Sequence, residues 1–419
     1  MTEANLILSK PGNDTFCTIQ LTGSKSESNR ALILHALSGG KVALRNLSSA
    51  VDTVTLDAIL KERNAKKGTA ESMTPEVNVG PAGTAMRFLT AYFATSGQEV
   101  VLTGTERMKQ RPIGILVDAL RSLGAEIDYV EKDGYPPLRF KNGFNQLSGK
   151  VSIRGNISSQ FITALLLVAP SLPLGLEINI EGELTSRPYV EMTLAMLADT
   201  GIRYHWEGQV ISIASQPFIE SLITVEPDWS AASYWYAIAA LSENSGISLP
   251  YLKQNSLQGD SRIASIMESF GITTVFSDDG LILSKSGAAI TENFFDLKDC
   301  PDLAQTVIVC SAALGHNATF TGLETLKIKE TDRILALQTE LAKIGVSLRE
   351  ENQLYHLDCS NLHFPEKVQI STYEDHRMAM AFAPLALKVK QLEIEDPAVV
   401  GKSYPSFWEH LKEAGFLAD

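Results

Sequence analysis

Six stretches rich in Ala, Leu, Ile and Met recur along the chain at intervals of roughly 70 residues, and this repeat limits the possible folds more than any other feature. Each stretch is apolar on nearly every face. In a protein that dissolves in water, such a pattern predicts a helix buried inside a core. The six predicted helices are Ser28–Ser38, Gly83–Thr95, Ser158–Ala169, Ser230–Leu241, Asp302–Leu314 and Asp375–Lys388.

A second set of six segments alternates with these helices and has one polar face, which predicts amphipathic helices. Most of them end in Gly, the residue that most readily adopts the left-handed conformation after a helix. These segments are Asp52–Asn64, Arg111–Gly124, Arg187–Gly201, Ser261–Gly271, Arg333–Gly345 and Phe407–Gly415. Short β-like runs such as Val100–Thr103 and Gln391–Glu395 accompany them. The sequence therefore predicts six similar α/β units, with the apolar helices inside and the sheets outside.

A chain of 419 residues is longer than a single hydrophobic core usually grows, so we expect two domains of three units each. The natural boundary lies at Val225–Asp228, just before the fourth apolar helix. We expect residues 23–226 to form an N-terminal lobe. Residues 227–419 would form a discontinuous C-terminal lobe together with residues 1–22, and the opening segment Asn5–Leu21 would be a strand of that lobe.

The formal net charge of -13 argues against nucleic-acid binding, because nucleic-acid binders usually carry a basic stripe. The longest apolar run, Phe161–Leu174, is too short to span a bilayer. The opening Met1–Asn5 lacks the basic region of a signal peptide. We therefore expect a cytoplasmic protein without a membrane partner, and we expect a monomer.

The four cysteines are widely scattered and form no C-x-x-C pair, which predicts neither a disulfide framework nor a thiolate metal site. His356, Cys359 and His363 lie close together in the sequence, but in an alternating segment whose side chains would point to both faces. We therefore expect neither a metal nor a cofactor.

Polar side chains gather at the start of the first apolar helix. The octet Gly23–Arg30 contains two cations and three serines and leads directly into that helix. Exposed N–H groups and the positive end of a helix dipole favour phosphate or carboxylate. Lys25 would add a point charge and Arg30 a bidentate fork. Taken alone, the octet is equally consistent with a solvated helix cap.

Comparable polar groups begin or precede most of the other apolar helices, which suggests that several helix starts converge on one cationic cleft for small polyanions. These groups are Gly83, Thr84 and Arg87; Ser158, Ser159 and Gln160; Asp228; Asp302; and Asp375, His376 and Arg377. Further polar residues precede amphipathic helices: Arg111, Ser186, Arg187, Tyr189, Lys329–Arg333, Lys402 and Ser403.

Two carboxylates among these cations are candidates for proton transfer. Asp302 lies at a helix start, which would favour its ionised form, and Glu330 is flanked by Lys329 and Arg333. Two structural alternatives stay open at this point. Asp302 could be a helix cap, and the segment Lys329–Arg333 could be a solvated helix start.

Six motifs closely resemble the 5-enolpyruvylshikimate-3-phosphate synthase family, the 3-phosphoshikimate 1-carboxyvinyltransferases of the shikimate pathway. They occur in order along the whole chain, in register with the six units. The motifs are Gly23-Ser24-Lys25-Ser26 with Arg30, Ala82–Arg87, Arg111–Gly114, Ser158–Phe161, Lys329–Arg333 and Asp375–Met380.

The resemblance implies a two-domain inside-out α/β barrel built from six βαβαββ repeats, three per domain, with buried parallel helices. It also implies transfer of the enolpyruvyl group of phosphoenolpyruvate to shikimate-3-phosphate, in a site that glyphosate inhibits. Shikimate-3-phosphate would be held by Ser26, Arg30, Ser158, Ser159, Gln160, Ser186, Tyr189 and Lys329. Phosphoenolpyruvate would be held by Lys25, Gly83, Arg111, Arg333, Arg377 and Lys402. His376 would also belong to the substrate site.

The same resemblance assigns the proton transfers. Asp302 would be the base on the 5-hydroxyl, and Glu330, with Lys25, the acid that protonates the methylene carbon. Addition would give a tetrahedral ketal, and elimination would then release phosphate.

Three positions depart from the family pattern: Pro81, Phe88 and Thr325 stand where many members carry Asn, Pro and Asn. The first two adjoin the expected phosphoenolpyruvate pocket and leave glyphosate sensitivity open. Three other classes of protein fit the sequence less well. The UDP-N-acetylglucosamine enolpyruvyl transferases typically carry Cys where this chain has Glu106. The RNA terminal phosphate cyclases bind RNA, which the net charge of -13 disfavours. A non-catalytic anion-binding protein would not need Asp302 and Glu330.

Overall fold

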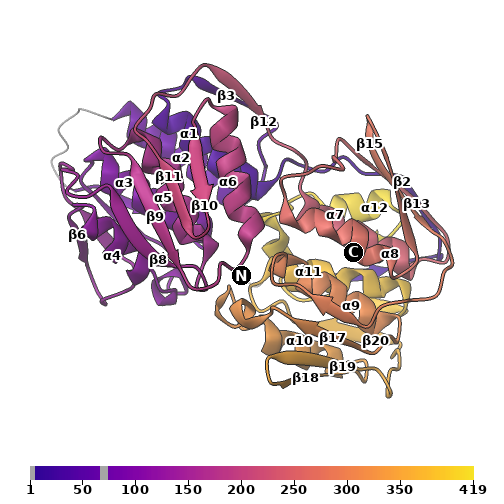
Figure 1. Ribbon diagram of the computed structural model, residues 1–419. Coiled ribbons are helices and arrows are strands. Elements are labelled where there is room, and N and C mark those ends of the chain that lie inside the picture. The colour runs from indigo at the N-terminus through magenta and orange to yellow at the C-terminus, as the bar shows by residue number, and fades with distance from the viewer. Residues whose placement is uncertain (1–4, 67–73) are drawn as a thin grey trace. The chain divides into compact units, whose positions relative to one another are not determined.

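The computed structural model describes residues 5–66 and 74–419. These residues form two compact units (Figure 1). The continuous unit runs from Gly23 to Val225, and the discontinuous unit combines Glu226–Asp419 with the residues that precede Gly23. The chain therefore passes from one unit to the other twice, after Thr22 and after Val225.

Two repeats of the continuous unit contain the full series of strand, helix, strand, helix, strand, strand. One consists of β4 (Glu76–Asn78), α3 (Gly83–Ser96), β5 (Val100–Thr103), α4 (Gly114–Ser122), β6 (Ile127–Tyr129) and β7 (Leu138–Phe140). The next consists of β8 (Lys150–Arg154), α5 (Ser159–Val168), β9 (Leu176–Glu181), α6 (Arg187–Asp199), β10 (Tyr204–Glu207) and β11 (Val210–Ile213). Their sheets have the orders β4-β5-β7-β6 and β8-β9-β11-β10. In both repeats a helix joins the first two strands, which are parallel, and the last two strands are antiparallel.

The discontinuous unit repeats this sheet order three times, as β2-β13-β15-β14, β16-β17-β19-β18 and β20-β21-β1-β22. Its first repeat contains α7 (Trp229–Leu241), β13 (Ser245–Pro250), α8 (Ile263–Glu268), β14 (Ile272–Ser277) and β15 (Gly280–Lys285). The second contains β16 (Phe294–Asp296), α9 (Ala304–Ala313), β17 (Ala318–Thr321), α10 (Arg333–Ala342), β18 (Ser347–Glu351) and β19 (Leu354–Asp358). The third contains β20 (Lys367–Ile370), α11 (His376–Phe382), β21 (Gln391–Ile394), α12 (Phe407–Glu413) and β22 (Leu417–Ala418).

The opening segment Asn5–Leu21 is not the single strand that we expected. It forms two strands, β1 (Leu6–Ser9) and β2 (Thr15–Thr18), because the intervening residues 10–14 include Pro11, which has no N–H to continue a ladder. The two strands join different sheets. β1 lies antiparallel between β21 and β22, and β2 lies parallel to β13.

The first repeat of the continuous unit consists of α1 (Lys25–Leu37), β3 (Val42–Arg45) and α2 (Val51–Ala65), and β12 (Ser221–Thr224) occupies its first strand position. β2, which precedes α1 in the chain, instead occupies the first strand position beside β13. Before the chain leaves the discontinuous unit, β2 joins a sheet of that unit. Before it leaves the continuous unit, β12 joins a sheet of that unit. We call this arrangement the strand exchange of β2 and β12.

The apolar helices lie inside their units. α1, α3 and α5 contact one another in the continuous unit, and so do α7, α9 and α11 in the discontinuous unit (Figure 1). Every residue of α9 and α11 is buried. Strands such as β8 instead alternate between buried and exposed residues, so one face of the sheet meets the helices and the other meets solvent. The predicted α/β fold with buried helices is confirmed. Within the described ranges, no helix is both long and apolar enough to cross a membrane.

Candidate active site

The start of α1 carries the first group of polar residues. Ser24 caps the helix by accepting a hydrogen bond from the Glu27 N–H at 3.4 Å. Lys25 is consequently the first helical residue, three positions earlier than we expected. Its Nζ lies 3.8 Å from Oδ2 of Asp52, a buried residue in the first turn of α2. Sequence reasoning did not single out Asp52, although its place at the start of a predicted helix was visible.

Arg30 is held inside the continuous unit and is only 2% exposed. Its Nε donates to Thr193 Oγ1 at 2.9 Å, Nη1 to the Ser26 carbonyl at 2.8 Å and Nη2 to the Tyr189 carbonyl at 3.2 Å. Burial lowers the pKa of Arg30 to about 10, since desolvation disfavours the charged form. The ring of Phe88 lies 5.5 Å from the guanidinium carbon. In this structure Arg30 thus ties the start of α1 to α6, and the unusual Phe88 packs against it.

The starts of α3 and α5 meet. Gln160 Nε2 donates to Thr84 Oγ1 at 3.4 Å. Gly83, the first residue of α3, faces the guanidinium of Arg111 so closely that a Cβ at Gly83 would lie 2.7 Å from Arg111 Nη1. Glycine is therefore what allows Arg111 to lie against the N-terminus of α3. A guanidinium beside the N–H groups of a helix start is suited to a small anion.

Three further candidate serines lie at the starts of α5 and α6. Ser158 caps α5 by accepting from the Gln160 N–H at 3.3 Å, and Ser159 follows it in the first turn. Ser186 precedes α6 with a left-handed φ of 54°, which a residue with a Cβ adopts only at a cost of about 1–2 kcal/mol. Tyr189 lies one turn further on, with its ring 5.8 Å from the Arg30 guanidinium carbon. Backbone strain of this kind often marks a functional position.

Arg333 is the centre of the polar cluster in the discontinuous unit. Its Nε donates to Asp375 Oδ2 at 2.7 Å, and its Nη2 lies 3.0 Å from Glu330 Oε2 and its Nη1 3.4 Å from Asp302 Oδ1. Burial alone would lower the pKa of Arg333. The three carboxylates outweigh burial and raise that pKa above its ordinary value. Arg333 is 2% exposed, so the alternative of a solvated helix start is wrong for this residue.

Asp302 faces two arginines. It lies in the 3₁₀ turn Pro301–Leu303 just before α9, whose capping position is Leu303, so the alternative of a helix cap is also wrong. Its Oδ2 is 2.7 Å from Arg377 Nη2, and Arg377 Nη1 donates to the Asp302 carbonyl at 3.3 Å. The carboxylate keeps about a fifth of its side-chain surface exposed, at 22%, and is accessible to a ligand.

Glu330 is held from two sides. Its Oε1 accepts from Lys402 Nζ at 2.8 Å, and its Oε2 accepts from Arg333 Nη2 at 3.0 Å. Lys402 comes from the 3₁₀ turn Pro397–Lys402, far along the chain. Lys329 follows the 3₁₀ turn Glu324–Ile328 and is half-buried. The structure therefore gathers Asp302, Glu330, Arg333, Arg377 and Lys402 into one network.

His376 lies at the start of α11 and is 1% exposed. Its Nδ1 is 3.6 Å from Oδ1 of Asp375, the residue that caps α11 by accepting from the Arg377 N–H at 2.9 Å. Among the sequence-predicted site residues of this unit, His376 is thus the most deeply enclosed. The adjoining Arg377 reaches Asp302 instead.

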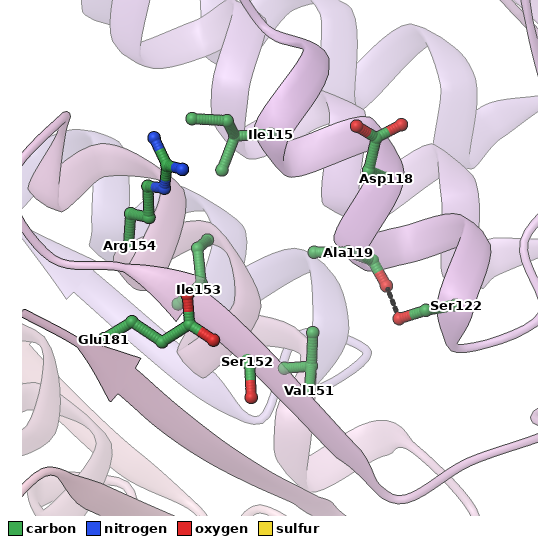
Figure 2. Close-up of a pocket in the computed structure, with 9 residues that line it drawn as sticks. All are labelled: Ile115, Asp118, Ala119, Ser122, Val151, Ser152, Ile153, Arg154 and Glu181. Carbon is green, nitrogen blue, oxygen red and sulfur yellow. Dashed lines mark hydrogen bonds between the residues drawn. The ribbon is translucent and has the colours of Figure 1, made fainter.

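A separate cavity of about 430 Å³ lies between α4 and β8 of the continuous unit (Figure 2). Its lining mixes apolar and charged side chains, among them Ile115, Val151, Arg154 and Glu181. None of the residues that the sequence analysis proposed for the site is among its lining residues, and no convergent set of cations faces it. The candidate residues therefore lie at the helix starts and not around this cavity.

Solved structures that share this fold include enolpyruvyl transferases. The chain superposes on an EPSP synthase from Acinetobacter baumannii with a TM-score of 0.78 and 19% identity, covering 99% of this chain and 100% of that one. It superposes on the enolpyruvyl transferase NikO from Streptomyces tendae with a TM-score of 0.71 and 13% identity, covering 100% and 99% of the two chains. The fold is thus that of the enolpyruvyl transferases.

Sequence comparison defines the family more narrowly. Residues 10–411 match the family model for EPSP synthase (3-phosphoshikimate 1-carboxyvinyltransferase). A 3-phosphoshikimate 1-carboxyvinyltransferase from Bacteroides fragilis is 47% identical over 402 residues, 95% of each chain. One from Escherichia coli is 37% identical over 416 residues, 94% of this chain and 95% of its own. The chain belongs to the EPSP synthase family.

Proposed function

We propose that this protein transfers the enolpyruvyl group of phosphoenolpyruvate to the 5-hydroxyl of shikimate-3-phosphate and releases phosphate, as a transferase of chorismate and aromatic amino acid biosynthesis. Membership of the EPSP synthase family supports the reaction. The observation that carries the proposal is the network in which Arg333 contacts both Asp302 and Glu330. Arg377 and Lys402 hold the other sides of these two carboxylates.

Two proton transfers are needed, and the network offers one carboxylate for each. In the addition step Asp302 accepts the proton of the 5-hydroxyl while the hydroxyl oxygen bonds to C2 of phosphoenolpyruvate. Glu330, assisted by Lys25, gives a proton to the methylene carbon C3. The product of this step is a tetrahedral ketal that retains the phosphate.

In the elimination step the C2–O bond to phosphate breaks, Asp302 returns its proton to the departing phosphate, and Glu330 takes back a proton from the C3 methyl group. The enolpyruvyl double bond forms again, and the acid is regenerated. Glu330 must carry a proton when the addition begins. The cations around the carboxylates stabilise the charge on the phosphate and carboxylate groups.

The binding roles follow the chemistry at each helix start. We propose that shikimate-3-phosphate is held by hydroxyl, amide and cationic groups: Ser26, Arg30, Ser158, Ser159, Gln160, Ser186, Tyr189 and Lys329. For phosphoenolpyruvate we propose Lys25, Gly83, Arg111, Arg333, Arg377 and Lys402, with His376 supporting the start of α11. Because Arg30 is buried and bonded to the carbonyls of Ser26 and Tyr189, we propose that it also orients those two residues.

We further propose that the protein works in the cytoplasm as a monomer and binds no nucleic acid. Both substrates are phosphorylated metabolites with several charges, which do not cross membranes unaided. The formal net charge of -13 supports the absence of a nucleic-acid partner, since it would repel a polyphosphate backbone.

A phosphate-release assay tests the reaction. Purified protein with phosphoenolpyruvate and shikimate-3-phosphate should release phosphate, whereas either substrate alone should not. Mass spectrometry should find the enolpyruvyl ether of shikimate-3-phosphate. Phosphate release with UDP-N-acetylglucosamine in place of shikimate-3-phosphate would overturn the proposal. Glu106, at the position of that family's typical cysteine, instead pairs with Lys109 at 3.2 Å on the surface.

A further inference from the structure

A buried carboxylate outside the proposed machinery lies directly against it. Asp260 belongs to the 3₁₀ turn Gly259–Arg262 that precedes α8, and it is 3% exposed. Its Oδ2 accepts a hydrogen bond from the Ser230 hydroxyl in the first turn of α7. Its Oδ1 has no hydrogen-bond partner among the residues that the structure describes. Burying a carboxylate with so few partners is costly, so the position requires an explanation.

Ser230 connects Asp260 to the network. The Ser230 Oγ lies 3.5 Å from Arg377 Nη2, and the same Nη2 lies 2.7 Å from Asp302 Oδ2. A serine hydroxyl has one proton, and a guanidinium only donates. When the Ser230 hydroxyl donates its hydrogen bond to Asp260, its lone pairs are therefore turned toward Arg377. Asp260 sets the direction of that hydroxyl.

The charges around Asp260 are unequal. Asp228 and Asp302 lie near it, and Arg377 is the cation that acts on it. Burial, followed by the charge of Asp302, raises the pKa of Asp260 to about 7, and Arg377 opposes this rise. With this raised pKa, Asp260 is partly protonated near pH 7. A protonated carboxyl group is less costly to bury with a single hydrogen bond than an ionised one. Ionised, it would add to the attraction that holds Arg377.

We propose that Asp260 is a positioning residue for phosphoenolpyruvate: through Ser230 it holds the Arg377 guanidinium in the orientation that binds the anionic substrate beside Asp302. The inference rests on the proposed function, because it takes phosphoenolpyruvate as the ligand of Arg377. Asp260 itself touches no reacting atom. Its effect should therefore be on the KM for phosphoenolpyruvate and much less on kcat or on the KM for shikimate-3-phosphate.

Substitutions at both ends of the relay test this. Ser230→Ala removes one oxygen and should raise the KM for phosphoenolpyruvate about tenfold, the usual effect of losing a hydrogen bond to a charged group. Asp260→Ala should do the same, and the double variant should be no worse than either single variant, because both break one relay. Ser230→Thr keeps the hydroxyl and should retain the wild-type KM.

The matched control is Ser233→Ala, which removes another buried hydroxyl from α7. The Ser233 Oγ contacts the Ser230 carbonyl and Thr306 Oγ1, and it is not part of the relay. This variant should leave the KM for phosphoenolpyruvate within about twofold of wild type, since it removes no bond to Arg377. If Asp260→Ala does not fold, Ser230→Ala alone still decides the question.

Three results would overturn the inference. They are an unchanged KM in Ser230→Ala, an equal rise of both KM values, or additive effects in the double variant. Failure of the proposed function has a different signature, because wild-type protein would then release no phosphate from the two substrates. Active wild-type protein with an unaltered Ser230→Ala variant would reject the role of Asp260 alone.

Discussion

Arg333 and Asp375 form an ion pair of 2.7 Å between Nε and Oδ2, with side chains that are 2% and 0% exposed. Asp375 also caps α11, so this pair joins the starts of α10 and α11. A buried pair that loses one partner leaves an uncompensated charge, which costs more than the pair itself contributes. The position of Arg333 between three carboxylates therefore depends on Asp375.

Asp375→Asn should lower the free energy of unfolding by about 3 kcal/mol, because Arg333 loses its shortest ion pair while Asn can still cap the helix. Chemical denaturation at neutral pH measures this. Asp332→Asn is the matched control, since Asp332 caps α10 by accepting from the N–H groups of Ile334 and Leu335. It should change stability by less than about 1 kcal/mol. A similar loss of stability in both variants would mean that the Arg333–Asp375 ion pair contributes no more than an ordinary helix cap.

Asp302→Asn and Glu330→Gln should each slow turnover by about 10²–10⁴-fold, the usual contribution of a general acid or base. Both substitutions keep the shape of the side chain, so KM values should change much less than kcat. Steady-state phosphate release measures both quantities. Glu350→Gln is the control, because it removes a carboxylate paired with Lys327 on the surface and should leave kcat unchanged. A near-normal kcat in either test variant would exclude that residue from proton transfer.

Gly83→Ala should raise the KM for phosphoenolpyruvate, because the new Cβ would lie 2.7 Å from Arg111 Nη1 and displace that guanidinium. The Arg111 side chain is flexible, so the free energy of unfolding should change little. Steady-state assays that vary one substrate at a time measure the two KM values. Gly149→Ala is a suitable control, since its Cβ would meet its nearest atom at 3.4 Å, an ordinary contact. An equal rise in the KM for both substrates would contradict a selective effect through Arg111.

Asp260 should make stability depend on pH. Its pKa is raised to about 7 in the folded protein, against about 4 for an unfolded chain, so the folded state binds the extra proton between these values. Its contribution is fully present below about pH 4 and is lost as the pH rises through about 7. Asp260→Asn should remove this loss. The stability of the variant relative to wild type should therefore increase from about pH 4 to pH 7, and denaturation at several pH values measures it. A constant difference would contradict the raised pKa.

The helices could be predicted from the sequence because their signal is local. The stretch Gly83–Thr95 is apolar on nearly every face, which predicts a buried helix, and α3 spans Gly83–Ser96. The predicted start of α1, Ser28, was three residues too late. The first turn of α1 is polar, and a polar turn cannot be told from a loop by its hydrophobicity. The cap at Ser24 was the missing signal.

The partners of single strands could not be predicted in this way. β2 and β12 are four-residue strands, and nothing within four residues specifies the sheet that they join. The same holds for the candidate site. The motifs named Asp302 and Glu330, but Asp260 stands in a turn without a motif, and only the folded chain brings it to Ser230. The burial of Arg30 was also hidden, because its partner Thr193 lies far along the chain.

The strand exchange of β2 and β12 determines which segments of the sequence contain all the strands of one unit. The segment Gly23–Val225 contains β12 and all its other strands, whereas a fragment that begins at Glu226 lacks β1 and β2. Asp419 and Ile7 exchange backbone hydrogen bonds of 3.1 and 2.9 Å, so a short linker could join Asp419 to Asn5. A circular permutant that starts at Glu226 and ends at Val225 would then encode the two units one after the other, with a single covalent connection between them.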